Sequence, residues 1–260
     1  MKNIIVIKIG GSTFGSGDTT IDDIVALQKK GLALIVVHGG GSTVTDWLKK
    51  QGVTTKFIRG ERVTDLSGLQ VAAAVLAGLV NKEITAAVNL RGGQAVGISG
   101  VDGALIESKV KDRDMGYVGS VEKVNADLLK ALLDDGFVTV VSPVSLYSLD
   151  RPADAPGIIN VNSDPVAGHI AAALGAKRLV FLTDVAGVKD KSGKLISLLS
   201  ARQAEAMLAS GEISGGMIPK VNACLQALNA GSVARIIDGR KSHALLQEID
   251  GGEGGTTIHR

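Results

Sequence analysis

The stretch LIVVHGGGSTVTDWL (Leu34–Leu48) carries the pattern that decides the fold class of the chain. A run of apolar residues stops at His38, three glycines follow, and a helical pattern then begins. A continuous apolar run of this length is typical of a strand that is buried on both faces of a sheet. Three adjacent glycines leave the backbone bare enough for a ligand to reach its N–H groups. The stretch therefore predicts a buried strand, a ligand-binding turn and a helix.

The alternation of short apolar runs with longer helical patterns recurs along the 260 residues. We predict buried strands at Asn3–Gly10, Leu32–Gly39, Gln94–Ser99, Phe137–Pro143, Arg178–Asp184 and Val233–Asp238. We predict helices at Thr20–Lys30, Thr43–Gln51, Ser67–Leu90, Asn125–Asp135, Asp164–Leu174, Ala201–Ser210 and Pro219–Ala230. This order indicates an α/β fold with a mainly parallel, doubly wound sheet in an αβα sandwich.

Two polar segments interrupt the alternation. Val53–Asp65 and Glu107–Val121 are typical of hairpins or flaps inserted on one side of the domain. The glycine-rich DGGEGGTTI (Asp250–Ile258) predicts a turn before a last short strand. We predict a single domain over residues 1–260, with a soft division near residue 172 between a part rich in flaps and a simpler second part.

The composition argues against several classes of protein. Hydrophobic residues make up 45% of the chain, which is enough for a sizeable core. The formal net charge is only +2 and the charges are interleaved, so we expect no nucleic-acid partner. The longest apolar run, near Val71–Val80, is too short to span a bilayer, and Lys8 interrupts any secretion signal. The single cysteine, Cys224, fits a small core residue and excludes an internal disulfide, so we expect a cytoplasmic protein with no membrane partner.

Polar and glycine residues gather where three of the predicted strands end, at Lys8–Gly11, His38–Gly41 and Asp184–Gly187. Ligands of open parallel sheets bind beyond the carboxyl ends of the strands, so we expect the functional site there. Lys8 interrupts an otherwise apolar strand, and burying an unpaired ammonium is costly. Lys8 must therefore reach a solvent cleft or meet an anion.

A second lysine, Lys220, stands near the start of a predicted helix. Gly215 and Gly216 precede that helix, and Pro219 suits its first turn. A cation is unfavourable at a helix N-terminus unless an anion binds there. Lys220 is therefore a better candidate for a functional residue than a lysine on a helix surface.

Three common sites are absent from the sequence. An esterase with an HGGG oxyanion hole needs a G-x-S-x-G nucleophile motif, which the chain lacks. The first strand is not followed by G-x-G-x-x-G, and no Walker loop GxxxxGK[ST] occurs. These motifs therefore do not identify the ligand of the glycine turns.

The ordered motifs of the chain resemble the amino acid kinase family, and within it the acetylglutamate kinases. They cover almost the whole length: KIGGS, VVHGGG, RGERVTD, AVGISGVDG, NVNSDPVAG, LTDVAGV, SGGMIPKV and GGTTI. The resemblance implies transfer of the ATP γ-phosphoryl group to the side-chain carboxylate of N-acetyl-L-glutamate. It also implies that residues 1–172 bind the acyl amino acid and that residues 173–260 bind ATP.

Site roles follow from the same resemblance, position by position. Lys8 and Lys220 would stabilise the transferring phosphoryl group, and Asp164 would organise both lysines. The substrate-binding residues would be Gly40, Gly41, Arg62 and Asn160. The nucleotide-binding residues would be Gly10, Gly11, Asp184, Val185, Ala186, Gly187, Val188, Lys189, Glu212, Ile213 and Ser214. Mg²⁺ is expected with ATP, bound chiefly through its phosphates, and we assign it no protein ligand. His38 is expected to anchor its loop rather than to act as an acid or base.

Two alternatives stay open at this point. A related kinase could act on glutamate or 2-aminoadipate attached to an acidic carrier protein, with Lys109, Lys111 and Arg113 as the docking cluster. A regulatory protein could also keep the fold and bind nucleotide without turnover. Because the chain starts directly at its first strand, without the extra N-terminal helix of arginine-sensitive hexamers in the family, we expect a homodimer.

Overall fold

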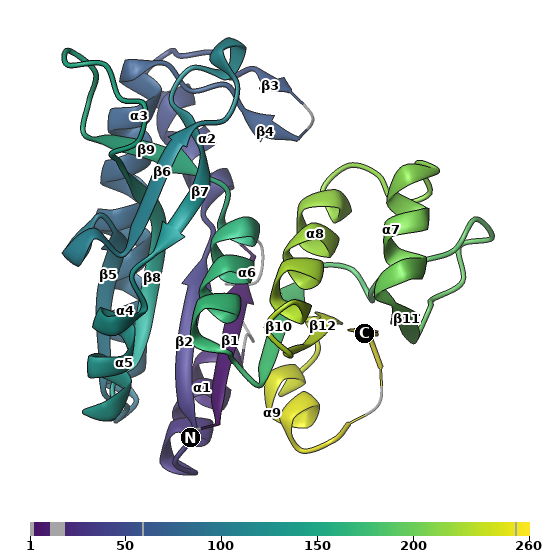
Figure 1. The fold of residues 1–260 in the computed structure, drawn as a ribbon. Helices are drawn as coiled ribbons and strands as arrows, with labels where there is room; N and C mark the ends of the chain where they lie inside the picture. Colours follow the sequence, from purple (N-terminus) through teal and green to yellow (C-terminus); the bar gives the residue numbers. More distant parts are fainter. Residues whose placement is uncertain (1–2, 11–18, 59, 253) are drawn as a thin grey trace.

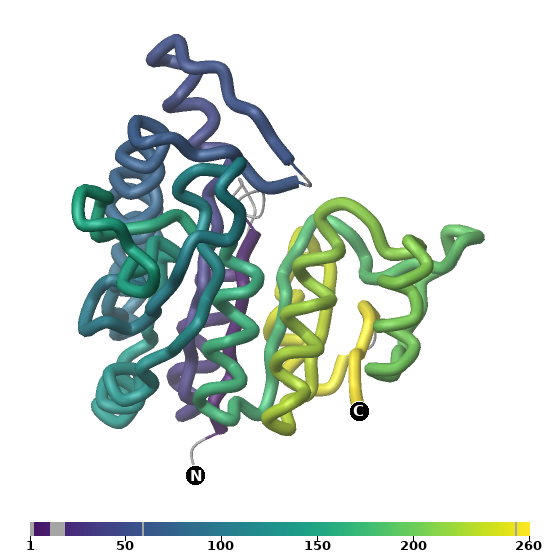
Figure 2. The backbone as a smooth tube through the Cα atoms, turned by 45° about the horizontal axis from the view of Figure 1, so that its top comes forward, coloured from purple at the N-terminus to yellow at the C-terminus, as the bar shows by residue number. Residues whose placement is uncertain are grey.

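A computed structural model describes residues 3–10, 19–58, 60–252 and 254–260 of the chain (Figure 1). Gly11, which we expected to bind nucleotide, lies outside the described residues. The described part forms one large sheet with helices on both of its faces, as the views in Figures 1 and 2 show.

Eleven strands in the described ranges make up the large sheet. In chain order they are β1 (Ile4–Ile9), β2 (Ala33–His38), β5 (Ala95–Gly100), β6 (Ile106–Val110), β7 (Val118–Val124), β8 (Val138–Tyr147), β9 (Ile158–Val161), β10 (Arg178–Thr183), β11 (Leu198–Ser200), β12 (Val233–Asp238) and β13 (Thr256–His259). Their order across the sheet is β11-β13-β12-β10-β1-β2-β8-β6-β7-β9, with β5 also paired to β8. A small separate hairpin joins β3 (Phe57–Ile58) and β4 (Glu61–Arg62).

The core of the sheet is parallel, as the sequence predicts. Strand β1 lies between β10 and β2 and pairs with both in parallel, and β12 and β8 continue the parallel arrangement outward. Antiparallel pairs occur between β12 and β13, β6 and β7, and β8 and β9. The prediction of a mainly parallel, doubly wound sheet is therefore confirmed.

Helices cover the two faces of the sheet in separate groups. One face packs against α5 (Ala126–Asp134), α6 (Ser163–Leu174), α7 (Ala201–Ala209) and α8 (Met217–Leu228). The other packs against α1 (Thr20–Lys29), α2 (Gly41–Lys50), α3 (Leu66–Ala73), the π-helix η1 (Ala74–Val80), α4 (Asn81–Leu90) and α9 (Ala244–Ile249). The described residues also contain two short 3₁₀ turns, η2 (Asp102–Ala104) and η3 (Arg113–Met115). The αβα sandwich is visible in Figure 1, where α5, α6 and α8 lie in front of the strands and α1 and α4 lie behind them.

The alternation of side chains along a strand decides which helices each functional residue meets. Ile5, Ile7 and Ile9 point to the face that carries α1, whereas Val6 points to the face that carries α6 and α8. Lys8, two residues beyond Val6, shares the α6 and α8 face. His38, two residues beyond Val36, shares the face that η1 and α4 cover.

The second polar segment, Glu107–Val121, contains an antiparallel hairpin of β6 and β7, one of the two structures that we expected there. We did not expect this hairpin to be part of the main sheet, where β6 pairs with β8. Its outward positions carry exposed charged residues such as Lys109 and Lys123, and these obscure the strand pattern. The predicted hairpin in Val53–Asp65 and the predicted last strand after the glycines are confirmed as β3–β4 and β13.

The segment Leu66–Leu90 is helical throughout, and by length and composition it could cross a membrane. Its apolar side chains instead pack on the sheet, with Leu69, Ala72, Val75, Ile84 and Val88 all buried. Asn81, the first residue of α4, is also buried, between Val75 and Ile84 in the segment. The segment is therefore a core helix of the α/β domain.

Helices α6 and α8 cross at Gly168, and this contact positions the functional residues that the two helices carry. A Cβ atom added to Gly168 would lie 2.7 Å from the carbonyl oxygen of Ala223 and 2.8 Å from its Cα. Asp164 lies one helical turn before Gly168, and Lys220 lies one turn before Ala223. The missing side chain of Gly168 lets the first turns of the two helices approach each other.

Replacing Gly168 with alanine should destabilise the protein, because the added methyl group meets backbone atoms of α8 that have little room to move. We expect a loss of about 1–3 kcal/mol in the free energy of unfolding, measured by urea denaturation. Gly78 of η1 is the matched control, since a Cβ atom there meets nothing within 4 Å. Gly78→Ala should leave stability unchanged or raise it by up to ~1 kcal/mol. Equal stabilities of the two variants would contradict the close packing of α6 on α8.

Candidate active site

Three charged side chains meet at the carboxyl end of β1. Lys8 extends from β1, Asp164 lies in the first turn of α6, and Lys220 lies in the first turn of α8. The Nζ of Lys8 lies 2.7 Å from one carboxylate oxygen of Asp164, and the Nζ of Lys220 lies 3.0 Å from the other. Residues far apart in the chain thus share one carboxylate.

The start of α6 is built to present Asp164. Asn162 is the N-cap of this helix, and its side-chain oxygen accepts a hydrogen bond of 2.9 Å from the backbone N–H of Asp164. The cap fixes the first turn of α6, and only 3% of Asp164 is exposed. Asp164 is therefore both a first-turn acid of its helix and the partner of two lysines.

Burial and charge set the protonation of this group. Burial lowers the pKa of Lys8, and the charge of Lys220 lowers it further, while Asp164 acts in the opposite direction. Burial raises the pKa of Asp164, but the two ammonium groups outweigh burial and hold that pKa below its ordinary value. One ionised carboxylate thus faces the amino groups of two lysines. Two basic groups beside one acid favour the approach of a further anion.

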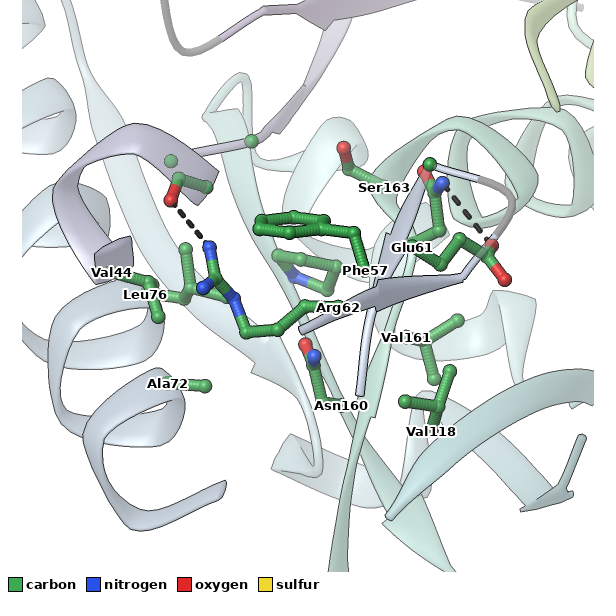
Figure 3. A pocket seen from close by; sticks show the side chains of 16 residues that line it. Val44, Phe57, Glu61, Arg62, Ala72, Leu76, Val118, Asn160, Val161 and Ser163 are labelled. Atoms are coloured by element: carbon green, nitrogen blue, oxygen red, sulfur yellow. Dashed lines mark hydrogen bonds between the residues drawn. The ribbon is translucent and has the colours of Figure 1, made fainter. Parts of the chain in front are cut away.

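A cavity of about 190 Å³ reaches Ser163, the residue before Asp164. Figure 3 shows the side chains that line it. Its walls include the glycine turn Gly39–Gly41, Arg62 of β4, Asn160 of β9 and Ser163, which precedes Asp164. Figure 3 shows Arg62, Phe57 and Asn160 gathered around the space. All four predicted substrate-binding residues, Gly40, Gly41, Arg62 and Asn160, therefore line one cavity.

Arg62 is the main cation of this cavity. Its Nη2 donates hydrogen bonds to the carbonyl oxygen of Gly41 at 2.9 Å and to the hydroxyl of Thr45 at 2.7 Å. Its Nη1 is buried and has no hydrogen-bond partner among the described residues. The guanidinium also lies 4.8 Å from the ring centroid of Phe57, whose side chain is half exposed. A buried donor on a fixed planar cation suits a carboxylate ligand.

The glycine turn supplies backbone N–H groups to the same cavity. Gly40 has φ +144°, a conformation that L side chains rarely adopt, and α2 begins at Gly41. The first N–H groups of a helix have no partner within the helix and carry its positive dipole end. The turn and the start of α2 therefore form an anion-binding wall.

His38, at the end of β2, has a structural place behind this wall. Its side chain is fully buried, and burial lowers its pKa to about 4. Its Nδ1 lies 2.7 Å from the carbonyl oxygen of Gly39. The contact ties the ring to the glycine turn, as we expected for a loop anchor.

Sequence reasoning missed Glu61, which lines the cavity next to Arg62. One oxygen of Glu61 lies 2.6 Å from the Nζ of Lys111, and the other accepts a hydrogen bond of 3.3 Å from the side chain of Asn162. Glu61 thereby joins the β3–β4 hairpin to the cap of α6. The motif GERVTD contains this acid, but nothing in the sequence points to its partners.

The predicted nucleotide-binding residues form two neighbouring loops after β10 and before α8. Val188 donates its backbone N–H to the hydroxyl of Thr256, and Glu212 pairs with Lys191 at 3.0 Å, which links the two loops. Asp184, Val185, Lys189 and Ser214 are exposed, whereas Gly187, Val188 and Ile213 are buried and can offer only backbone groups. Gly10 follows β1 directly, and its N–H donates to Leu182.

The part of the chain that the structure describes offers neither a metal-binding cluster nor a reactive thiol. No group of three or more His, Cys, Asp or Glu side chains is placed there to hold a metal ion. Cys224 is fully buried, and burial raises the pKa of its thiol. The cysteine therefore has a packing role in α8.

Comparison with known proteins agrees with this geometry. A model of the amino acid kinase family matches residues 3–238. The acetylglutamate kinase of Dehalococcoides mccartyi is 52% identical over 257 residues, which span 99% of this chain and 94% of that protein. The acetylglutamate kinase of Cereibacter sphaeroides is 45% identical over 261 residues, 99% of this chain and 87% of its own. The structure of N-acetylglutamate synthase from Neisseria gonorrhoeae, complexed with coenzyme A and N-acetyl-glutamate, matches with a TM-score of 0.83 and 26% identity. That match covers 99% of this chain and 59% of the synthase.

Lys111 should assist the binding of an acidic ligand by neutralising Glu61 at the cavity wall. Lys111→Met leaves the Glu61 carboxylate uncompensated, so the affinity for an acidic ligand should fall roughly fivefold by calorimetry, with the N-acetyl-glutamate of the synthase complex as the probe. The effect is modest because Lys111 is part exposed. The double variant Glu61→Leu with Lys111→Met should bind within about twofold of the wild type, because both charges are gone.

The matched control is Lys109→Met. Lys109 pairs with Glu122 at 3.2 Å, and neither residue lines the cavity. This variant should bind like the wild type. A double variant that binds no better than Lys111→Met would contradict the neutralising role of Lys111.

Proposed function

The chain belongs to the amino acid kinase family, and on this basis we propose that it is an ATP-dependent phosphotransferase with a carboxyl group as acceptor. It transfers the γ-phosphoryl group of ATP to the side-chain carboxylate of N-acetyl-L-glutamate and forms N-acetylglutamyl 5-phosphate in arginine biosynthesis. The observation that carries the proposal is the convergence of Lys8 and Lys220 on Asp164, beside a cavity lined by Arg62 and Asn160. The relatives named acetylglutamate kinase support the choice of substrate.

The reaction needs little acid–base chemistry from the protein. A side-chain carboxylate has a pKa near ~4.3, so at neutral pH it is already ionised and can attack phosphorus directly. One carboxylate oxygen bonds to the γ-phosphorus while the bond to the β,γ-bridging oxygen breaks, and ADP leaves with that electron pair. The obstacle is the approach of one anion to another, which positive charge around the moving phosphoryl group removes.

Lys8 and Lys220 supply this charge from two different elements. Asp164 holds the two ammonium groups near each other in the absence of phosphate, because without it they would repel in a buried place. When the phosphoryl group lies between the donor and the acceptor, the lysines donate to its oxygens. Asp164 is thus the organiser of the pair rather than a general base.

The cavity residues hold the acceptor in line with this group. Arg62 binds the α-carboxylate of the substrate through the donor that is unpaired among the described residues, and Gly40 and Gly41 offer backbone N–H groups. The side chain of Asn160 donates to Thr64 at 3.2 Å, which fixes its amide at the cavity wall for a hydrogen bond to the substrate.

The two parts of the chain divide the substrates between them. The cavity is lined by residues between Gly39 and Ser163, which supports binding of the acyl amino acid by residues 1–172. The loops at Asp184–Lys189 and Glu212–Ser214 support binding of ATP by residues 173–260. Mg²⁺ bound through the phosphates of ATP would neutralise part of their charge, and we assign it no ligand from the protein. The protein works as a homodimer in the cytoplasm, on small-molecule substrates.

The carrier-linked alternative loses its docking surface in the structure. Lys109 and Lys111 are paired with Glu122 and Glu61, so these lysines do not form a free basic patch for an acidic carrier. A binding protein without turnover would have no use for two lysines on one buried carboxylate. Neither alternative is supported by a further observation.

Hydroxylamine trapping tests the proposed substrate, because it converts acyl phosphates to hydroxamates. The protein with ATP and Mg²⁺ should give hydroxamate with N-acetylglutamate and little with free glutamate or N-acetylaspartate. Equal product from glutamate, or none from any of the three acids, would refute the assignment. If none of the three acids gives product, the remaining possibilities are a carrier-linked substrate or a nucleotide-binding protein without turnover.

Lys8→Met should lower kcat by on the order of a hundredfold or more, because one of the two charges on the moving phosphoryl group is lost. The apolar side chain suits the buried strand, so the variant should fold. Calorimetry should show N-acetylglutamate binding within a fewfold of wild type, since Lys8 does not line that cavity. An unchanged kcat would remove Lys8 from the mechanism.

A further inference from the structure

A π-helical segment interrupts the helix behind the glycine turn. The seven residues Ala74–Val80 of η1 lie between the α-helices α3 and α4, and Asn81 follows immediately. π-Helical segments are rare, and they occur frequently at functional sites. The proposed mechanism assigns no role to η1 or to Asn81, although both lie next to the cavity wall.

Asn81 is fully buried and links three strands. Its Nδ2 lies 3.0 Å from the carbonyl oxygen of Val140 on β8, 3.1 Å from that of Ile98 on β5 and 3.2 Å from Nε2 of His38 on β2. Its Oδ1 accepts a hydrogen bond of 3.0 Å from Lys82. The two carbonyl oxygens can only accept, so they identify the atom that faces His38 as the amide nitrogen. This nitrogen has two hydrogens for three acceptors, so His38 shares a hydrogen with one of the carbonyl oxygens.

Strand β5 leaves room for this side chain. A Cβ atom added at Gly97 would overlap Oδ1 of Asn81 and the hydroxyl of Thr85. The absence of a side chain at this position allows the Asn81 amide to reach between the strands. The position of Asn81 on α4 therefore depends on a glycine at position 97 of β5.

The contacts of His38 leave one protonation state. Because the carbonyl oxygen of Gly39 can only accept, Nδ1 of His38 must carry a hydrogen and donate it. Because the amide nitrogen of Asn81 cannot accept, Nε2 cannot carry a hydrogen toward it and is the acceptor of the shared amide hydrogen. Both bonds exist together only when the ring is neutral with its hydrogen on Nδ1.

The bond from His38 fixes the orientation of the next peptide group. In a trans peptide the carbonyl and the following N–H point in opposite directions. With the Gly39 carbonyl turned toward His38, the N–H of Gly40 points away from the buried ring. A Cβ atom added to Gly40 would lie 2.8 Å from Leu76 and 3.3 Å from Val80, so residues of η1 pack directly against the turn.

We propose that Asn81 is a positioning residue for the acceptor site: through the neutral Nδ1–H form of His38 it orients the Gly39–Gly40 peptide toward the substrate. The π-helical segment η1 places Asn81 and the side chains of Leu76 and Val80 behind the turn at the same time. The inference rests on the proposed function, since it concerns the cavity that holds N-acetylglutamate. It explains why the Gly39–Gly40 peptide is oriented as it is in the cavity wall.

The test compares Asn81→Ala with Asn89→Ala. Asn89 is the matched control because it lies on the same helix and also bonds β5, donating to Ala95 at 3.2 Å and accepting from it at 2.7 Å. Asn81→Ala should raise the KM for N-acetylglutamate at least tenfold, with the KM for ATP within twofold of wild type. Asn89→Ala should leave both constants within twofold, although it loses stability. Equal changes in the two variants would overturn the proposal.

Nitrogen NMR of the imidazole rings gives a readout that a purely structural role would not move. The NMR signal of wild-type His38, identified by its absence in His38→Asn, should show hydrogen on Nδ1 only. Asn81→Ala removes the group that keeps hydrogen off Nε2, so a fraction of its His38 rings should carry hydrogen on Nε2. Wild-type His38 with hydrogen on Nε2 would overturn the proposal. Asn81→Ser, which keeps a short donor, should lie between wild type and alanine in KM and serves if the alanine variant fails to fold.

The NMR measurement needs no turnover, so it separates this inference from the proposed function. If the wild type forms no hydroxamate but shows the Nδ1–H form of His38, the substrate assignment fails and the tautomer stands. If the wild type forms hydroxamate but its His38 carries hydrogen on Nε2, the substrate assignment stands and the role of Asn81 fails.

Discussion

The shared carboxylate of Asp164 is the interaction on which the site depends. Two ammonium groups, from Lys8 and Lys220, approach one buried anion from opposite halves of the chain. Neither lysine would be stable in that place alone, because burial disfavours an unpaired charge. The arrangement requires β1, α6 and α8 to converge at their ends, and the close crossing of α6 and α8 at Gly168 allows it. Packing in the core and charge at the site are therefore parts of the same constraint.

At this end of the sheet, the described residues present more hydrogen-bond donors than acceptors. Two lysines face the one carboxylate of Asp164, Arg62 has a buried donor unpaired among the described residues, and the first turn of α2 presents N–H groups that have no acceptor within the helix. In the function that we propose, anionic substrates would pair with these groups, and binding would be tied to the charge that the reaction uses. Positions prepared before the substrate arrives need no rearrangement during phosphoryl transfer.

Much of the fold follows from local patterns in the sequence. The buried parallel strands read as continuous apolar runs, and Lys8 is visible because it breaks one of them. A hairpin or flap was expected at Glu107–Val121, but the place of β6 and β7 in the main sheet was not, because charged residues alternate along these strands. The Glu61–Lys111 pair, the crossing at Gly168 and the Asn81–His38 bond were not predictable, since each depends on residues brought together only by the tertiary fold. The π-helical segment η1 has an apolar composition like that of an ordinary core helix, so no residue type marks it.

The central claim is that Lys8 and Lys220 both bind the transferring phosphoryl group. A crystal structure with ADP, Mg²⁺, N-acetylglutamate and aluminium fluoride, a planar mimic of that group, tests it most directly. The account predicts that the Nζ atoms of both lysines lie within about 3.2 Å of the fluoride ligands, with Asp164 still in contact with both. A complex in which either ammonium group points away from the mimic would contradict it.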